Sequence, residues 1–218
     1  VEESREKLAA ALGAKPQEII FTASGTEANN LAVKGMYWQS RNTNQLKSGI
    51  CSTPIEHHAI LDPLEWLERE EGATLHLADV DSDGVVNVDN VAEILSERAA
   101  EIAFVTVMHS NNEIGALQPI SDIAAIAREY QIPMHSDAVQ SFGKVPLNFS
   151  ELGIDAMTIS GHKIGGPLGV AALVAKKNLE LTPLLHGGGQ EREVRSGTLH
   201  TPAIAAFATA AEIAQTRL

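Results

Sequence analysis

The stretch DAMTISGHKIGGPLGVAALVA, residues 155–175, contains two apolar runs on either side of a glycine-rich loop. The runs at 155–160 and 168–175 are short and apolar on both faces, which is typical of strands buried between two layers of helices. Similar runs recur at 18–22, 49–53, 73–78, 101–108 and 132–136, and helical patterns lie between them at 1–12, 26–39, 59–71, 88–99, 121–130 and 202–216. This alternation predicts one α/β domain, a three-layer α/β/α arrangement around a mainly parallel sheet.

Two of the predicted helices carry recognisable start signals. Ser121 opens the helix at 121–130 and places Asp122 in its first turn. Thr201 and Pro202 open the last helix, as its cap and its first-turn proline. Both starts agree with the alternating pattern of strands and helices.

Composition limits the classes of function that the chain can have. Its 218 residues include 16 basic and 28 acidic side chains, and the resulting net charge of -12 argues against a nucleic-acid or anionic membrane surface. No run approaches the roughly 18 consecutive apolar residues of a membrane span, and the first residues do not resemble a signal peptide. Cys51 is the single cysteine, which excludes an intrachain disulfide and a cysteine-rich metal site. We therefore expect a cytoplasmic protein with no membrane contact and no metal site.

The loop within residues 155–175 carries a lysine that is placed for chemistry. Lys163 follows an apolar strand and is flanked by glycines, so we expect its amine to be partly desolvated. Desolvation lowers the pKa of an amine and makes it a better nucleophile. The alternative is a solvated loop lysine, which is the commoner case for an isolated lysine.

An aspartate follows another predicted strand at the same edge of the sheet. Asp137 lies in HSDAVQ, residues 135–140. A carboxylate at this position would stabilise a proton on a pyridine nitrogen. The protonated ring is positively charged and therefore acts as an electron sink. The alternative is an aspartate that caps the next turn.

Three further polar segments follow predicted strands. TASGTEANN, residues 22–30, runs into a helix whose first turn can bind a phosphate, and simple N-capping is the alternative. IEHHA, residues 55–59, has adjacent histidines, which form a poor metal pair but leave one imidazole to stack on an aromatic ligand. MHSNNEIG, residues 108–115, has consecutive asparagines that either form a turn or contact a ligand. All five segments lie at the carboxyl ends of predicted parallel strands, where one cleft would gather them.

The order and spacing of these segments resemble one enzyme family. The motifs SGHKIGGPLGV, HSDAVQSFGKVPL, TASGTEANN, IEHHAILDP, MHSNNEIGALQPI and GGGQEREVRSGTL are similar to those of the cysteine desulfurases of the NifS/IscS group. These are class V aminotransferase-like enzymes of fold type I that use pyridoxal 5′-phosphate. The resemblance implies a homodimeric enzyme that converts L-cysteine to L-alanine and passes sulfur through an enzyme persulfide to an acceptor or scaffold protein, as in iron–sulfur cluster assembly.

The resemblance also implies roles for ten residues. Lys163 would bind the cofactor covalently, Asp137 would pair with its pyridine nitrogen, and His57 would stack on the ring and assist proton transfer. The other residues would hold the cofactor: Asn112 and Gln140 at its O3′ and the adjoining substrate atoms, Gly25, Thr26, Ser160 and His162 at its phosphate, and Thr198 at the phosphate of the neighbouring subunit.

The chain departs from the family pattern because it has no counterpart of the persulfide cysteine, which the family places downstream of the RSGTL motif. Cys51 lies on a predicted strand before IEHHA, so we interpret it as a buried structural thiol. Residues 1–218 would then be a cofactor-binding large domain that lacks an N-terminal segment and the C-terminal small domain, with little or no desulfurase activity of its own. The alternatives are another class V reaction, such as that of an aminotransferase or a selenocysteine lyase, and a catalytically silent domain.

Overall fold

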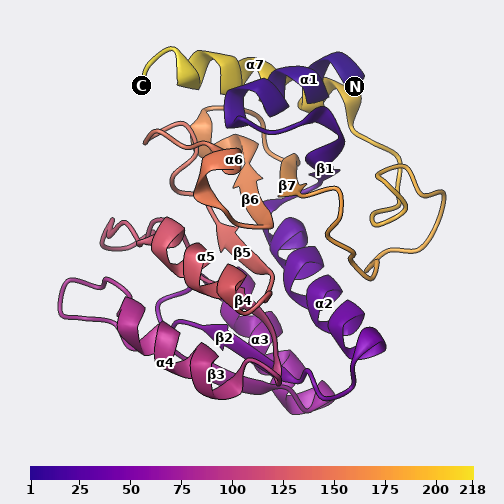
Figure 1. Ribbon diagram of the computed structural model, residues 1–218. Helices are drawn as coiled ribbons and strands as arrows, with labels where there is room; N and C mark the ends of the chain where they lie inside the picture. The colour runs from indigo at the N-terminus through magenta and orange to yellow at the C-terminus, as the bar shows by residue number, and fades with distance from the viewer.

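The structure, a computed structural model, describes all of residues 1–218 and is built around one seven-stranded sheet (Figure 1). The strands are β1 Ile19–Thr22, β2 Gly49–Ser52, β3 Thr74–Leu77, β4 Ile102–Thr106, β5 Met134–Asp137, β6 Ala156–Ser160 and β7 Ala171–Ala175. The α-helices are α1 Glu2–Leu12, α2 Gly25–Thr43, α3 His58–Glu71, α4 Val88–Arg98, α5 Ile120–Glu129, α6 Phe149–Leu152 and α7 Thr201–Gln215, and the 3₁₀ turns are η1 Pro16–Glu18 and η2 Gly161–Ile164. Every predicted strand and helix is present, and α6, η1 and η2 are additional.

The sheet is mainly parallel, as predicted. Its strand order is β1-β7-β6-β5-β4-β2-β3, and only β7 runs antiparallel to its neighbours. A parallel crossover needs a dozen or more residues, whereas β6 and β7 are joined by residues 161–170 alone. The chain therefore turns back, and β7 pairs directly with β6 in the opposite direction.

Helices cover both faces of the sheet, which confirms the predicted three layers. On β1, Ile19 and Phe21 pack with the core beneath α1, α4, α5 and α7, whereas Ile20 packs with the core beneath α2 and α3. The same alternation recurs on β6 and β7. In Figure 1, α1 and α7 lie side by side although they come from opposite ends of the chain.

Three local predictions are wrong. β3 was expected to be buried on both faces, but it is the edge strand of the sheet and is half-exposed. Ser121 does not begin its helix, because α5 starts one residue earlier at Ile120, whose side chain is buried in the core. Thr201 does not cap α7 but is its first residue, and the cap is His200, whose Nδ1 accepts a hydrogen bond from the amide of Ala203 at 3.2 Å.

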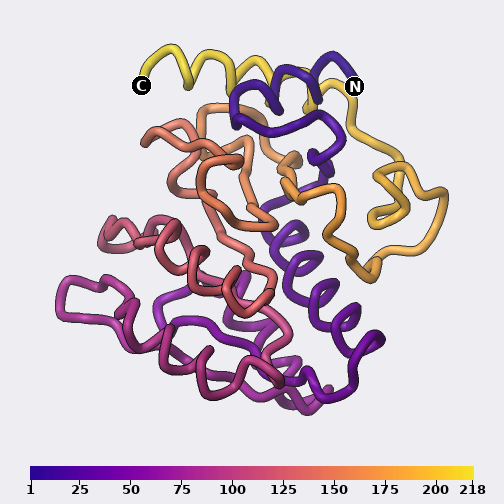
Figure 2. The backbone as a smooth tube through the Cα atoms, in the orientation of Figure 1, coloured from indigo at the N-terminus to yellow at the C-terminus, as the bar shows by residue number.

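A long segment between β7 and α7 contains no helix or strand, and Figure 2 shows it extending beyond the sheet. Two ion pairs hold residues 191–195 of this segment against the rest of the chain. The Glu191 carboxylate is fully buried and accepts hydrogen bonds from the Arg5 guanidinium and from the Phe21 amide, each at 2.8 Å. The Arg195 guanidinium donates to Glu27 in the first turn of α2 at 2.7 Å. Residues 191–195 are therefore fixed beside β1 and the start of α2.

None of the helices combines the length and apolarity that crossing a bilayer requires.

The connections out of β2 and β4 leave in opposite directions, and this arrangement opens a crevice. These two strands are neighbours, yet α3 follows β2 on one face of the sheet and α5 follows β4 on the other. In open α/β sheets, ligands bind outside the carboxyl ends of strands where the connections diverge in this way. The topology thus points to the loops after β2 and β4 as part of a binding site.

Candidate active site

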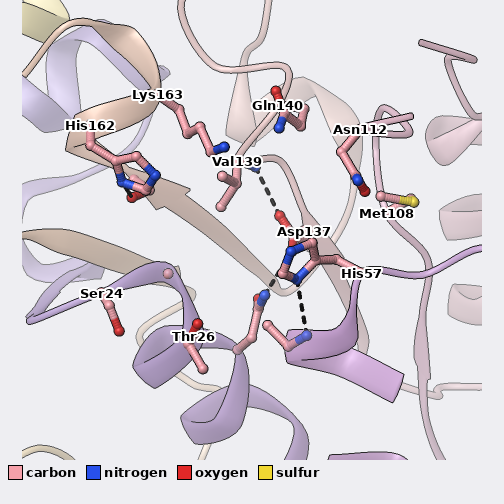
Figure 3. Close-up of a pocket in the computed structure, with 14 residues that line it drawn as sticks. Ser24, Thr26, His57, Met108, Asn112, Asp137, Val139, Gln140, His162 and Lys163 are labelled. Atoms are coloured by element: carbon pink, nitrogen blue, oxygen red, sulfur yellow. Dashed lines mark hydrogen bonds between the residues drawn. The ribbon is translucent and has the colours of Figure 1, made fainter. Parts of the chain in front are cut away.

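A cavity of about 260 Å³ opens at the carboxyl ends of the parallel strands (Figure 3). Its volume is close to the lower end of the range of roughly 300–1,000 Å³ that is usual for small-molecule sites. Nine of the ten predicted site residues line it, namely Gly25, Thr26, His57, Asn112, Asp137, Gln140, Ser160, His162 and Lys163. Segments that are far apart in the sequence therefore meet in one place.

Asp137, the last residue of β5, is the acidic group that lines this cavity. Its side chain is buried, and its two oxygens accept hydrogen bonds from the Val139 amide at 2.9 Å and from the Asn29 side-chain amide at 2.7 Å. Burial raises the pKa of Asp137, whereas these two hydrogen bonds and the nearby positive charge of Lys163 lower it. The carboxyl group is thus held in one orientation and partly compensated by its surroundings.

His57 ends the β2–α3 loop and caps α3. Its Nδ1 accepts a hydrogen bond from the Ala59 amide at 3.0 Å, which leaves Nε2 as the protonated nitrogen of the neutral ring. In Figure 3 the imidazole lies beside Asp137 in the cavity. His58 instead extends into solvent, where its Nδ1 lies 3.0 Å from Asp62 Oδ1, so the two adjacent histidines point in different directions.

The start of α2 forms one wall of the cavity. Ser24 caps this helix, since its Oγ accepts a hydrogen bond from the Glu27 amide at 3.1 Å, and Gly25 and Thr26 are the first helical residues. A Cβ on Gly25 would lie 3.3 Å from Val139 and 3.6 Å from Ser160, so a side chain here would crowd the wall. The free amides and the positive end of the helix dipole make this wall suited to an anion.

Ser160, His162 and Lys163 come from the end of β6 and the η2 turn that follows it. The Ser160 hydroxyl lies 2.9 Å from His162 Nδ1, and both side chains line the cavity opposite α2. The Lys163 amine points into the cavity in Figure 3. Its side chain is exposed rather than partly buried as expected, because it lines an open cavity.

The remaining predicted residues divide into two groups. Asn112, on the β4–α5 loop, and Gln140, just after β5, line the cavity, and Gln140 accepts a hydrogen bond from the Lys144 amine at 2.6 Å. Thr198 does not line the cavity, because it is exposed in the long segment before α7. A role for Thr198 at a neighbouring subunit remains a prediction.

Two buried residues beside this site were not predicted. Asn29 donates to Asp137 from α2, and Glu56 accepts hydrogen bonds from both Thr53 and Met108. Both lie inside quoted motifs, TASGTEANN and IEHHA, but their partners belong to distant segments. Only the tertiary structure reveals these contacts.

Cys51 lies within β2 and is completely buried, as predicted. Burial raises the pKa of its thiol to about 12. The thiol therefore has little thiolate character and no access to the cavity. No group of three or more histidine, cysteine, aspartate or glutamate side chains is placed to hold a metal ion.

Comparison with protein families and known proteins gives a consistent result. The family model for aminotransferase class V matches residues 1–217. An IscS-like cysteine desulfurase from Mycobacterium tuberculosis is 46% identical over 214 residues, a match that covers 98% of this chain and 54% of the relative. The cysteine desulfurase IscS of Dictyoglomus turgidum is 42% identical, with 98% of this chain and 52% of the relative covered. The chain thus spans about half the length of the curated relatives that it matches.

Solved structures agree with this result. A NifS-like protein superposes with a TM-score of 0.91 at 37% identity, over 99% of this chain and 58% of that one. A structure of SspA in complex with cysteine gives a TM-score of 0.89 at 39% identity, over 97% of this chain and 59% of that one. These likenesses confirm the predicted fold, which is that of the NifS-like proteins (fold type I).

Proposed function

The chain belongs to the aminotransferase class-V family, and we propose that residues 1–218 form the cofactor-binding large domain of a cysteine desulfurase that uses pyridoxal 5′-phosphate. The observation that carries this proposal is the meeting of Lys163, Asp137 and the start of α2 in one cavity. An amine, a buried carboxyl group and an anion-binding helix end match the aldehyde, the pyridine nitrogen and the phosphate of this cofactor.

The donor set fits the cofactor at each of these three points. Asp137, oriented by Asn29 and the Val139 amide, would stabilise a proton on the pyridine nitrogen. The amides at the start of α2, with Ser160 and His162, would hold the phosphate. Gly25 lies so close to Val139 that a larger residue would narrow the cavity. A glycine at this position therefore lets the backbone of α2 form the wall of the cavity.

Other residues of this site would act on the ring and on the substrate. The cofactor, when bound, supplies an electron sink for negative charge that develops on the substrate. Lys163 would hold the cofactor covalently and His57 would stack on its ring, with Nε2 free to exchange a proton because Nδ1 is engaged by the Ala59 amide. Asn112 and Gln140 would orient the cofactor's O3′ and the adjoining substrate atoms.

The sulfur transfer needs a thiol that Cys51 does not supply. In the proposed reaction, L-cysteine and a protein thiol give L-alanine and a protein persulfide, so the sulfur acceptor must be reachable and ionised. Cys51 is completely buried, and its pKa is raised to about 12. We therefore propose that the acceptor thiol and the small domain belong to sequence outside residues 1–218, since the chain spans about half the length of its relatives.

Two features of the proposal concern partners and location. We infer a cytoplasmic homodimer in which Thr198 of each chain reaches the phosphate held by the other. Thr198 is exposed and the segment around it is anchored by the Arg195 and Glu191 ion pairs, which supports this role. A sulfur acceptor or scaffold protein would then receive the sulfur.

The proposal is tested by binding and by product analysis. The chain should bind pyridoxal 5′-phosphate more tightly than pyridoxal, because the start of α2 recognises the phosphate. A full-length protein containing this chain should release L-alanine from L-cysteine. Equal binding of the two compounds would contradict the phosphate site, and release of a keto acid or a preference for selenocysteine would favour the other class V reactions.

A further inference from the structure

A buried carboxyl group joins two loops of the candidate active site. Glu56 Oε1 accepts a hydrogen bond from the Thr53 hydroxyl at 2.8 Å and another from the Met108 amide at 2.8 Å. Thr53 follows β2 and Met108 follows β4, the two strands whose connections diverge. Glu56 therefore ties the loop that carries His57 to the loop that carries Asn112.

The other oxygen of this carboxyl group has no partner. Glu56 is 5% exposed, no lysine, arginine or histidine pairs with it, and its Oε2 is buried without a hydrogen bond. A carboxylate in such a place would carry an uncompensated charge, which is strongly unfavourable. A proton on Oε2 removes that charge and leaves Oε1 free to accept both observed hydrogen bonds.

The surroundings of Glu56 favour the same protonated form. Asp137 on β5 is the charged group that faces Glu56, and Lys163 compensates Asp137 in turn. Burial and, to a smaller extent, the Asp137 charge raise the pKa of Glu56 to about 8. Asn29 Oδ1, whose amide donates to Asp137, is also buried without a partner, so two acceptor oxygens beside Asp137 lack a donor. A proton on Glu56 Oε2 converts one of these two acceptors into a hydrogen-bond donor.

We propose that Glu56 is a positioning residue that works as a neutral carboxylic acid, joining the His57 and Asn112 loops and leaving Asp137 as the only carboxylate of the cavity. The proposal deepens the proposed function, because a second negative charge and a loosened His57 loop would both disturb the cofactor site. The neutral state of Glu56 is a property of the chain without cofactor and can be tested separately.

Infrared spectroscopy tests the protonation state directly. The cofactor-free chain at pH 7 should show the carbonyl stretch of a protonated carboxylic acid, and this band should be absent in Glu56→Gln. The matched control is Glu68→Gln, which removes an exposed carboxylate from α3 and should leave the band unchanged. Identical spectra of the parent and Glu56→Gln would overturn the proposal.

Cofactor binding tests the positioning role. Glu56→Gln keeps a carbonyl acceptor and a neutral group, so it should bind pyridoxal 5′-phosphate within about twofold of the parent. Glu56→Ala loses both hydrogen bonds and should bind the cofactor at least about tenfold more weakly. This change corresponds to a loss of about 1.4 kcal/mol in binding free energy. Weak binding by Glu56→Gln, in a variant with the circular dichroism of the parent, would show that a charge is needed and would refute the proposal. Failure of the parent itself to bind the cofactor would count against the proposed function, and the infrared band would still decide the state of Glu56.

Discussion

Replacing Asn29 with alanine should destabilise the chain by an amount that depends on the charge of Asp137. The Asn29 amide donates to Asp137 Oδ2 at 2.7 Å, and both groups are buried. A hydrogen bond to a charged group contributes about 1.5–3 kcal/mol. Alanine has a better helix propensity than asparagine, which offsets about 0.5 kcal/mol of this loss. We expect a net decrease of about 2 kcal/mol in the free energy of unfolding at pH 7.

Urea unfolding followed by circular dichroism measures this decrease. The matched control is Asn30→Ala on the same helix, where the lost hydrogen bond goes to the exposed Thr26 carbonyl and the cost should be within about 0.5 kcal/mol. The Asn29 amide lowers the pKa of Asp137, so the difference between the two variants should shrink as acid protonates Asp137. Equal stabilities of Asn29→Ala and Asn30→Ala at pH 7 would refute the account of how Asp137 is held.

Three further predictions concern buried groups outside the cavity. Arg5→Met should lower the free energy of unfolding by about 3–5 kcal/mol in urea titrations, because it leaves the fully buried Glu191 carboxylate without its ion-pair partner. A loss below about 1 kcal/mol would contradict this prediction. His135 is buried between two threonine hydroxyls and its pKa is lowered to about 3, so the unfolded chain binds a proton that the folded chain does not. Stability should therefore fall below about pH 6.5 by up to about 1.4 kcal/mol per pH unit, and this part of the slope should vanish in His135→Gln; an unchanged slope would show that His135 is not the group responsible. Cys51 should resist alkylation by iodoacetamide at pH 8 in the folded chain and react in urea, because it is buried and burial raises the pKa of its thiol to about 12. Rapid alkylation without denaturant would show that the thiol is accessible.

The alternation of apolar strands and helical patterns was sufficient to predict the layers and the mainly parallel sheet. Strand ends were the most informative feature for the site, because carboxyl ends of parallel strands share one edge. Asp137 and Lys163 could be placed in one cleft from this rule alone, before any contact between their segments was known. The rule works because it depends on chain direction and not on side-chain packing.

Features that depend on neighbours from distant segments could not be predicted. β3 resembles the other strands in sequence, and only the strand order reveals that it lies at an edge. Asn29 has the sequence context of an ordinary helix start, yet its partner Asp137 lies 108 positions away. Nothing in the sequence around Glu56 indicates its role, because that role depends on the Met108 amide of another loop. Local sequence patterns therefore do not predict which buried polar groups from distant segments contact one another.

The measurement that tests the central claim most directly is covalent capture of the cofactor. The chain would be incubated with pyridoxal 5′-phosphate, reduced with borohydride and digested for peptide mapping by mass spectrometry, with Lys163→Ala and Lys144→Ala as paired variants. Lys144 lies near the same cavity but is bound to Gln140, so its loss should leave the labelling intact. We predict a visible absorption band before reduction and a single adduct on Lys163 after it, both absent in Lys163→Ala. No band, or an adduct spread over other lysines, would contradict the account and favour a catalytically silent domain of the same fold.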